Sequence, residues 1–218
     1  MKEVTTKFIL VRHGETNYNS KLILQGWQDS QLNENGIAQA KAVAEYLKDR
    51  KFDAAYSSVS SRAADTAREV LKYHPEIELT LTGDLRECHL GEFEGRYQPD
   101  VLKEHPEIIN AFRQEELEPI IKDGETRQEF QQRVSGFFAA ILPKHPDQTV
   151  LISAHGGVMQ RIFCMAAGIP SLGNLLPMTA NASVSSIVYF HRSGKWQLDT
   201  WNYHDHLQGL SIKPALAL

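Results

Sequence analysis

The sequence has few cysteines, no long apolar run and no surplus of positive charge, and each absence excludes a class of protein. Its two cysteines, Cys88 and Cys164, do not suggest a disulfide framework. No stretch approaches the roughly 20 apolar residues that a membrane span requires. The formal net charge of −4, without a long basic stretch, gives no support for nucleic acid as the main partner. No glycine-rich loop ends in Gly-Lys-Ser/Thr, so a P-loop nucleotide site is not indicated.

What remains is an ordinary globular composition. The chain has 218 residues, of which 42% are hydrophobic and 23% are charged. This length fits one large α/β domain over residues 1–218, with a core that needs neither disulfides nor a structural metal. Residues 1–6 are polar, and the apolar segment after them is shorter than the core of a signal peptide. We therefore expect a cytoplasmic protein.

Apolar runs that alternate with helical patterns predict the fold class. Strands are expected at 8–11, 54–57, 150–153, 184–191 and 196–203. Helices are expected at 33–50, from Ser60 or Ser61 to Leu71, at 126–141 and at about 157–168. The alternation predicts an α/β fold, a three-layer α/β/α sandwich with a mostly parallel central sheet.

Two of the expected helices have recognisable first residues. Asn33 suits the N-cap position of the first helix, and Thr126 with Glu129 forms a capping-box pattern. Helical spacing predicts that the helix after Asn33 buries Ile37, Ala40, Ala44 and Leu47.

Residues 92–125 interrupt the alternation of strands and helices. They contain ten acidic and four basic residues, a formal charge of −6. A short helix is expected at about 101–112. We interpret the whole segment as a lid-like insertion over the carboxyl edge of the sheet. The tail beyond His206 is expected to be poorly ordered, and His204-Asp205-His206 to be solvated rather than a metal site.

Basic and imidazole side chains follow three of the expected strands. Arg12 and His13 come directly after residues 8–11, while Arg62 and His155 follow the strands at 54–57 and 150–153. Ligands of open α/β sheets bind at the carboxyl ends of the strands, so these side chains predict an anion pocket.

His13 is the candidate nucleophile of this pocket. A neutral imidazole is a good nucleophile near neutral pH because its unperturbed pKa is roughly 6.5. Its second nitrogen needs a hydrogen-bond partner, and the carbonyl group of Gly14 is placed to provide one. The alternative is a hydrogen-bonded histidine with a structural role only.

Several motifs, in order along the chain, resemble those of the histidine phosphatase superfamily, also called the phosphoglycerate mutase-like family. The first is RHGETNYN, from Arg12 to Asn19. The others are Leu24-Gln25-Gly26, residues 32–40, residues 57–67, Leu85-Arg86-Glu87, Gly91, Glu94-Gly95, Gly124-Glu125-Thr126 and His155-Gly156-Gly157. The resemblance extends from Phe8 to about Tyr203.

The resemblance implies a role for each matching residue. His13 matches the nucleophile that becomes phosphohistidine, and Glu87 matches the general acid and base. The alternative for Glu87 is a surface ion pair with Arg86 or a nearby lysine. Arg12, Arg62 and His155 match residues around the transferred phosphoryl group. Further substrate-contacting positions are Asn19, Gln25, Gly26 and Gly156. The chemistry needs no metal and no other cofactor.

Three functions are compatible with these motifs. Residues 88–95 have the Gly-x-x-Glu-Gly form of the phosphatase branches, and an acidic lid suits a bisphosphorylated intermediate poorly. These two features favour hydrolysis of a small phosphate monoester over the activity of a cofactor-dependent phosphoglycerate mutase. A module that only binds a phosphorylated ligand is the third reading, although it needs neither His13 nor Glu87. The expected partner is a small phosphorylated metabolite, and the oligomeric state is open, a homodimer included.

Overall fold

A computed structural model describes residues 3–107, 121–169 and 177–212. Its six described strands form one sheet in the order β3-β2-β4-β1-β5-β6. The strands are β1 (Thr5–Arg12), β2 (Ala54–Ser58), β3 (Leu79–Thr82), β4 (Thr149–Ala154), β5 (Val184–Phe190) and β6 (Lys195–Tyr203). Pairing is parallel from β3 to β1, and β5 is antiparallel to both β1 and β6. The predicted α/β fold with a mostly parallel sheet is confirmed.

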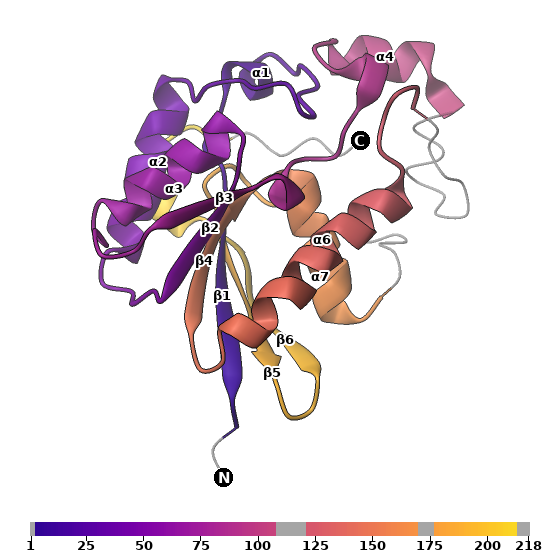
Figure 1. Ribbon diagram of the computed structural model, residues 1–218. Coiled ribbons are helices and arrows are strands. Elements are labelled where there is room, and N and C mark those ends of the chain that lie inside the picture. The colour runs from indigo at the N-terminus through magenta and orange to yellow at the C-terminus, as the bar shows by residue number, and fades with distance from the viewer. Residues whose placement is uncertain (1–2, 108–120, 170–176, 213–218) are drawn as a thin grey trace.

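Helices cover both faces of this sheet (Figure 1). Helices α2 (Glu34–Leu47) and α3 (Ser61–Leu71) lie on one face, and α6 (Arg127–Ile141) and α7 (Gly156–Ala167) lie on the other. The shorter elements are α1 (Asn17–Ser20), α4 (Gln98–Glu104) and the 3-10 turns η1 (Gly83–Leu85), η2 (Gly91–Phe93), η3 (Leu142–Lys144) and η4 (Asp205–Leu207). No helix within the described ranges is long and apolar enough to cross a membrane.

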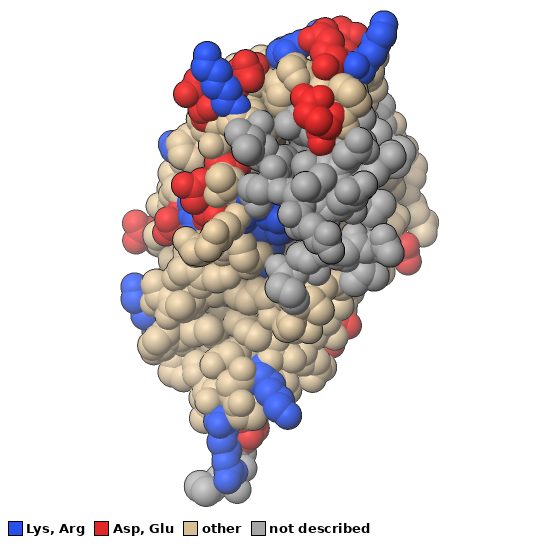
Figure 2. Space-filling view, turned by 90° about the vertical axis from the view of Figure 1, so that its right-hand side faces the viewer, with Lys and Arg blue, Asp and Glu red and all other residues tan. Residues whose placement is uncertain are grey.

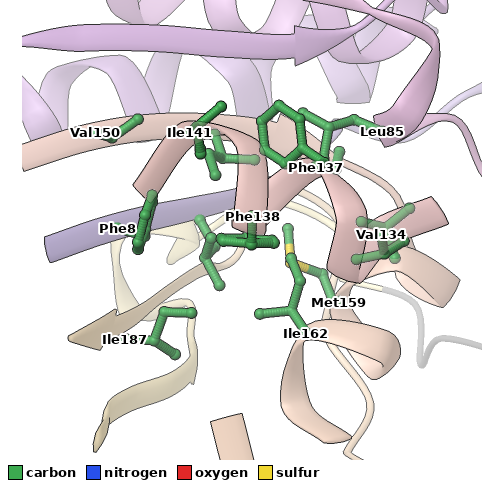
Figure 3. Close-up of a cluster of buried hydrophobic side chains, with 14 of the residues drawn as sticks. Phe8, Leu85, Val134, Phe137, Phe138, Ile141, Val150, Met159, Ile162 and Ile187 are labelled. Carbon is green, nitrogen blue, oxygen red and sulfur yellow. The ribbon is translucent and has the colours of Figure 1, made fainter. Parts of the chain in front are cut away.

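The central strand β1 supplies both hydrophobic cores. Phe8 and Leu10 belong to the core under α6 and α7, whereas Ile9 and Val11 belong to the core under α2. Figure 3 shows part of the first core, where Phe8 lies near Phe138. Because successive side chains of a strand point to opposite faces, a strand covered on both sides needs an unbroken apolar run.

The helix starts agree with the sequence in most details. The Asn33 side chain accepts a hydrogen bond from the Gly36 amide, and Thr126 and Glu129 form a complete capping box. Ser60 is the N-cap of α3, but its side chain makes no capping bond. The predicted burial of Ile37 is wrong, since this side chain is 43% exposed. In the first turn of α2 it is Gly36 that faces the molecule, so close to the Glu15 carbonyl that an added Cβ would lie 1.9 Å from its oxygen.

The segment 92–125 contains a shorter helix than predicted. Helix α4 spans Gln98–Glu104 rather than 101–112, and residues 108–120 lie outside the described part. The described flanks of the segment pack through a small apolar cluster at the end of the molecule where α4 lies (Figure 1). This cluster consists of Leu24, Leu90, Phe93, Val101 and Ile121. The role of the segment as a lid stays a prediction.

The chain after His206 is more ordered than predicted. Leu207 is fully buried in the core under α2, and Leu210 packs against the same core. The expected disorder is therefore wrong as far as residue 212, where the description ends. The prediction that His204-Asp205-His206 is solvated is also wrong for His206, which is half-buried with its Nε2 2.9 Å from the carbonyl oxygen of Ala182, whereas Asp205 is exposed.

Candidate active site

Four of the predicted site residues meet at the carboxyl ends of the central strands. Arg12 ends β1, His13 follows it, Arg62 lies in the first turn of α3, and His155 is the N-cap of α7. The parallel pairing of β1 and β4 sets Arg12 opposite Ala154, so His13 and His155 leave the sheet at the same level. Their ring centroids are 5.2 Å apart.

The imidazole of His13 is buried and held in one orientation. Its Nδ1 lies 2.7 Å from the carbonyl oxygen of Gly14. A carbonyl oxygen only accepts, so Nδ1 carries the proton and Nε2 keeps its lone pair. The backbone of His13 is held as well, because Asn181 Nδ2 donates to its carbonyl oxygen over 3.0 Å. The ring therefore presents a neutral, unprotonated nitrogen in a fixed direction.

The guanidinium of Arg62 is anchored by carbonyl groups of the loop at residues 26–28. Its Nη1 and Nη2 donate to the oxygens of Gln28 and Gly26, each over 2.9 Å. Its Nε donates to Nδ1 of His155 over 3.2 Å, which leaves the proton of this imidazole on Nε2. Within the described residues, Nε2 of His155 and Nε of Arg12 are buried without a hydrogen-bond partner. Two unsatisfied buried N–H groups near the His13 ring are donors that an anion would use.

Burial and positive charge shift the pKa values of these groups. Burial, with the charges of Arg62 and Arg12 as smaller causes, lowers the pKa of His13 well below 6.5. The pKa of His155 is lowered well below 6.5 by the same main cause. Burial lowers the pKa of Arg12 to about 10 and also lowers that of Arg62. At neutral pH the site therefore combines two guanidinium charges with two uncharged imidazoles. Figure 2 shows basic atoms in a recess beside acidic side chains, below the end of the molecule that carries α4.

Glu87 points into the same region from the segment after η1. Its Oε2 accepts a hydrogen bond of 3.0 Å from the amide of Gly157, and its Oε1 accepts one of 2.9 Å from the Cys88 amide. The carboxylate thus lies at the N-terminus of α7, two residues from His155. Arg86 does not pair with it, because its guanidinium lies over the ring of Trp27, 4.7 Å from the centroid. The alternative of an ion pair between Glu87 and Arg86 is wrong.

The remaining predicted residues surround this centre in different ways. The side-chain oxygens of Asn19 and Gln25 accept hydrogen bonds from Thr16, so their amide N–H groups are the ones left for a ligand. Gly26 adopts a left-handed backbone, with φ at 51°, and its carbonyl group holds Arg62. An added Cβ at Gly156 would lie 3.4 Å from Cζ of Arg12. The start of α7 thus lies beside this guanidinium, and an added Cβ would make an ordinary van der Waals contact with it.

Three residues of the site were not predicted from the sequence. Asn181 supports the His13 backbone, the carbonyl group of Thr179 accepts from Nη1 of Arg12, and Arg133 binds the backbone of the segment that carries Glu87. The first two precede β5, whose antiparallel pairing with β1 brings its start to this edge of the sheet. The described residues contain no group of three or more His, Cys, Asp and Glu side chains that could hold a metal ion.

The fold and this geometry define an α/β protein with an anion site built around a buried histidine. The chain belongs to the histidine phosphatase superfamily, branch 1, whose family model matches residues 8–204. The family predicted from the motifs is therefore confirmed.

Named relatives are similar over nearly the whole chain. A metal-independent phosphoserine phosphatase of Arabidopsis thaliana is 37% identical over 95% of this chain and 85% of its own. An uncharacterized phosphatase PhoE of Bacillus subtilis is 30% identical over 94% of this chain and 98% of its own. The structure of Bacillus stearothermophilus YhfR, 30% identical, superposes with a TM-score of 0.86 over 93% of this chain and 100% of that one. These similarities fit the phosphatase function that the sequence predicts.

Proposed function

We propose that this protein hydrolyses small phosphate monoesters through a covalent phosphohistidine on His13. The observation that carries the proposal is the fixed His13 ring, whose Nδ1 is bound to Gly14 and whose Nε2 is free to attack. Around it lie Arg12, Arg62 and His155, which bring positive charge and unsatisfied N–H groups. Phosphoryl transfer needs mainly positioning and stabilisation of charge on the transferring oxygens.

In the first step, Nε2 of His13 attacks the phosphorus atom. The bond from nitrogen to phosphorus forms as the ester bond from phosphorus to oxygen breaks. The protonated carboxyl group of Glu87 gives its proton to the leaving oxygen, so that an alcohol departs. Arg62 and His155 stabilise the charge on the oxygens of the transferring group.

In the second step, water attacks the phosphohistidine. The Glu87 carboxylate takes a proton from this water, the bond from phosphorus to nitrogen breaks, and inorganic phosphate leaves. His13 returns to its neutral form with the proton still on Nδ1. One carboxyl group thus serves both steps, because it lies beside the leaving group first and beside the water afterwards.

The acidic segment 92–125 favours this reaction over that of a mutase. Its formal charge of −6 is a poor clamp for a bisphosphorylated intermediate, which a mutase must retain. The relatives carry names with different substrates, including phosphoserine and alpha-ribazole phosphates, so the expected partner stays a small phosphorylated metabolite. The cytoplasmic location and a homodimer also stay predictions.

The test is hydrolysis of p-nitrophenyl phosphate by the wild type, by His13→Ala and by His191→Ala. His191 is a matched control, because it follows the end of β5 far from the site and bonds to Thr6. We expect His13→Ala to abolish turnover. It should also abolish the covalent phosphoenzyme, which is trapped by quenching the reaction without acid. His191→Ala should keep both the turnover and the phosphoenzyme. Equal rates for the wild type and His13→Ala would overturn the proposal.

A separate assay distinguishes a mutase from a phosphatase. It follows the conversion of 3-phosphoglycerate with and without bisphosphoglycerate. We expect inorganic phosphate to be released, and we expect bisphosphoglycerate not to accelerate the isomerisation of 3-phosphoglycerate. Isomerisation that depends on bisphosphoglycerate and exceeds hydrolysis would favour the mutase instead. Tight binding of phosphorylated ligands without any turnover would favour the binding module.

A further inference from the structure

Arg133, in α6, donates hydrogen bonds to the backbone of the segment 84–89, which carries Glu87. We propose that Arg133 is a positioning residue, which fixes the backbone of Glu87 so that its carboxyl group meets the leaving oxygen. The inference rests on the proposed role of Glu87 as general acid.

Arg133 binds three carbonyl groups of this segment. Its Nη1 donates to the oxygens of Asp84, over 2.8 Å, and Arg86, over 2.9 Å. Its Nη2 donates to the carbonyl oxygen of Glu87 over 3.1 Å. The planar guanidinium thus fixes the backbone at Asp84, at Arg86 and at Glu87 itself. A lysine has neither the plane nor the number of donors for this arrangement.

The partly buried carboxylate of Glu125 holds the guanidinium in turn. Nε and Nη2 of Arg133 donate to the two carboxylate oxygens of Glu125 over 2.8 Å and 2.7 Å. The two side chains are only 15% and 11% exposed, so the pair is largely shielded from solvent. Glu125 also binds His89, on the other side of Glu87: its amide donates to the His89 carbonyl oxygen over 2.8 Å, and the His89 amide donates to its Oε2 over 3.3 Å. The pair therefore brackets the segment before and after the acid.

All five N–H groups of the Arg133 guanidinium have a partner in these contacts. Two go to Glu125 and three go to carbonyl oxygens of the segment. An arginine has five such donors, so none is left for a phosphate or another substrate group. Arg133 consequently acts through Glu87 and not by binding the substrate.

The Glu87 carbonyl oxygen receives a second bond from the opposite part of the site. The indole Nε1 of Trp27 donates to it over 2.8 Å, and the Trp27 amide donates to the Glu94 carboxylate. The same loop holds Arg62 through Gly26. The acid is thus fixed relative to both α6 and the loop that anchors the phosphate-binding arginine. Proton transfer requires a donor–acceptor distance of about 2.6–3.2 Å, so loosening either bond should weaken protonation before it weakens phosphate binding.

The test compares two leaving groups in Arg133→Lys. The measured quantity is the ratio of kcat/KM for p-nitrophenyl phosphate, which needs little protonation, to kcat/KM for glycerol 2-phosphate, an alkyl ester that needs it. We expect this ratio to rise about tenfold, a part of the 10²–10⁴ that general acid catalysis contributes. The fraction of folded enzyme cancels in the ratio. Arg68→Lys is the control, because Arg68 forms an exposed ion pair with Asp65 on α3 and should leave the ratio unchanged.

The double variant Arg133→Lys/Glu87→Gln decides whether the effect passes through the acid. If Arg133 acts only through Glu87, this variant has the same ratio as Glu87→Gln alone. Equal losses on both substrates, or a further rise of the ratio in the double variant, would overturn the inference. If Glu87→Gln alone has the same ratio as the wild type, Glu87 is not the general acid. The proposed mechanism then fails at Glu87, and the inference about Arg133 fails with it. If Arg133→Lys does not fold, Glu125→Gln loosens the same guanidinium and should raise the ratio in the same direction.

Discussion

The two buried imidazoles of the site should make the folded protein sensitive to mild acid. His13 and His155 have pKa values well below 6.5, mainly because of burial, while in the unfolded chain both titrate near their ordinary value. Below about pH 6.5 the unfolded chain binds more protons than the folded one, so the free energy of unfolding falls as the pH falls. Each imidazole contributes about 1.4 kcal/mol per pH unit in this range, or about 3 kcal/mol for both between pH 7.5 and 5.5.

Urea unfolding at pH 7.5 and pH 5.5 measures this loss in the wild type and in His13→Asn/His155→Asn. The buffer should contain no phosphate, since an anion that binds the folded state would add its own stabilisation. The double variant should lose about 3 kcal/mol less stability than the wild type over the two pH units. His206, whose pKa is also lowered by partial burial, contributes equally to both proteins and cancels. An identical pH dependence in the two proteins would refute the reasoning.

Three further substitutions test single contacts of the structure. Arg62→Ala should lower kcat/KM for p-nitrophenyl phosphate by 10²–10³ or more (an order-of-magnitude range), because it removes a fixed charge next to the transferring group; a loss of less than tenfold would contradict this. Gly26→Ala should lower the urea midpoint, because φ is 51° and an added Cβ would lie 2.1 Å from Oε1 of Glu94. Thr126→Ala should cost about 1 kcal/mol of unfolding free energy in the same assay, as expected for a lost N-cap; an unchanged midpoint would show that the capping box does not stabilise α6.

The centre of the site could be predicted from the sequence for a physical reason. Arg12, His13, Arg62 and His155 each follow an apolar run that forms a strand, and neighbouring parallel strands end at one edge of the sheet. The bond from His13 to the Gly14 carbonyl could also be anticipated, because it joins adjacent residues. Contacts between adjacent residues, and residues that directly follow a strand, can thus be predicted from their spacing in the sequence.

Contacts that depend on how distant elements pack could not be predicted in the same way. Asn181 reaches His13 only because β5 pairs antiparallel with β1. Arg133 acts on backbone carbonyl groups, which have no signature in the residue pattern. The burial of Ile37 was predicted wrongly because helical spacing gives the apolar stripe but not where the helix meets the loop beside Glu15.

The place of β1 in the sheet has a consequence for how the protein is made. This strand lies between β4 and β5, so its partners are more than 130 residues later in the chain. During synthesis, four consecutive apolar residues, from Phe8 to Val11, leave the ribosome long before either neighbour exists to cover them. The nascent chain therefore carries an exposed, aggregation-prone stretch beside His13 until residues 149–190 have emerged.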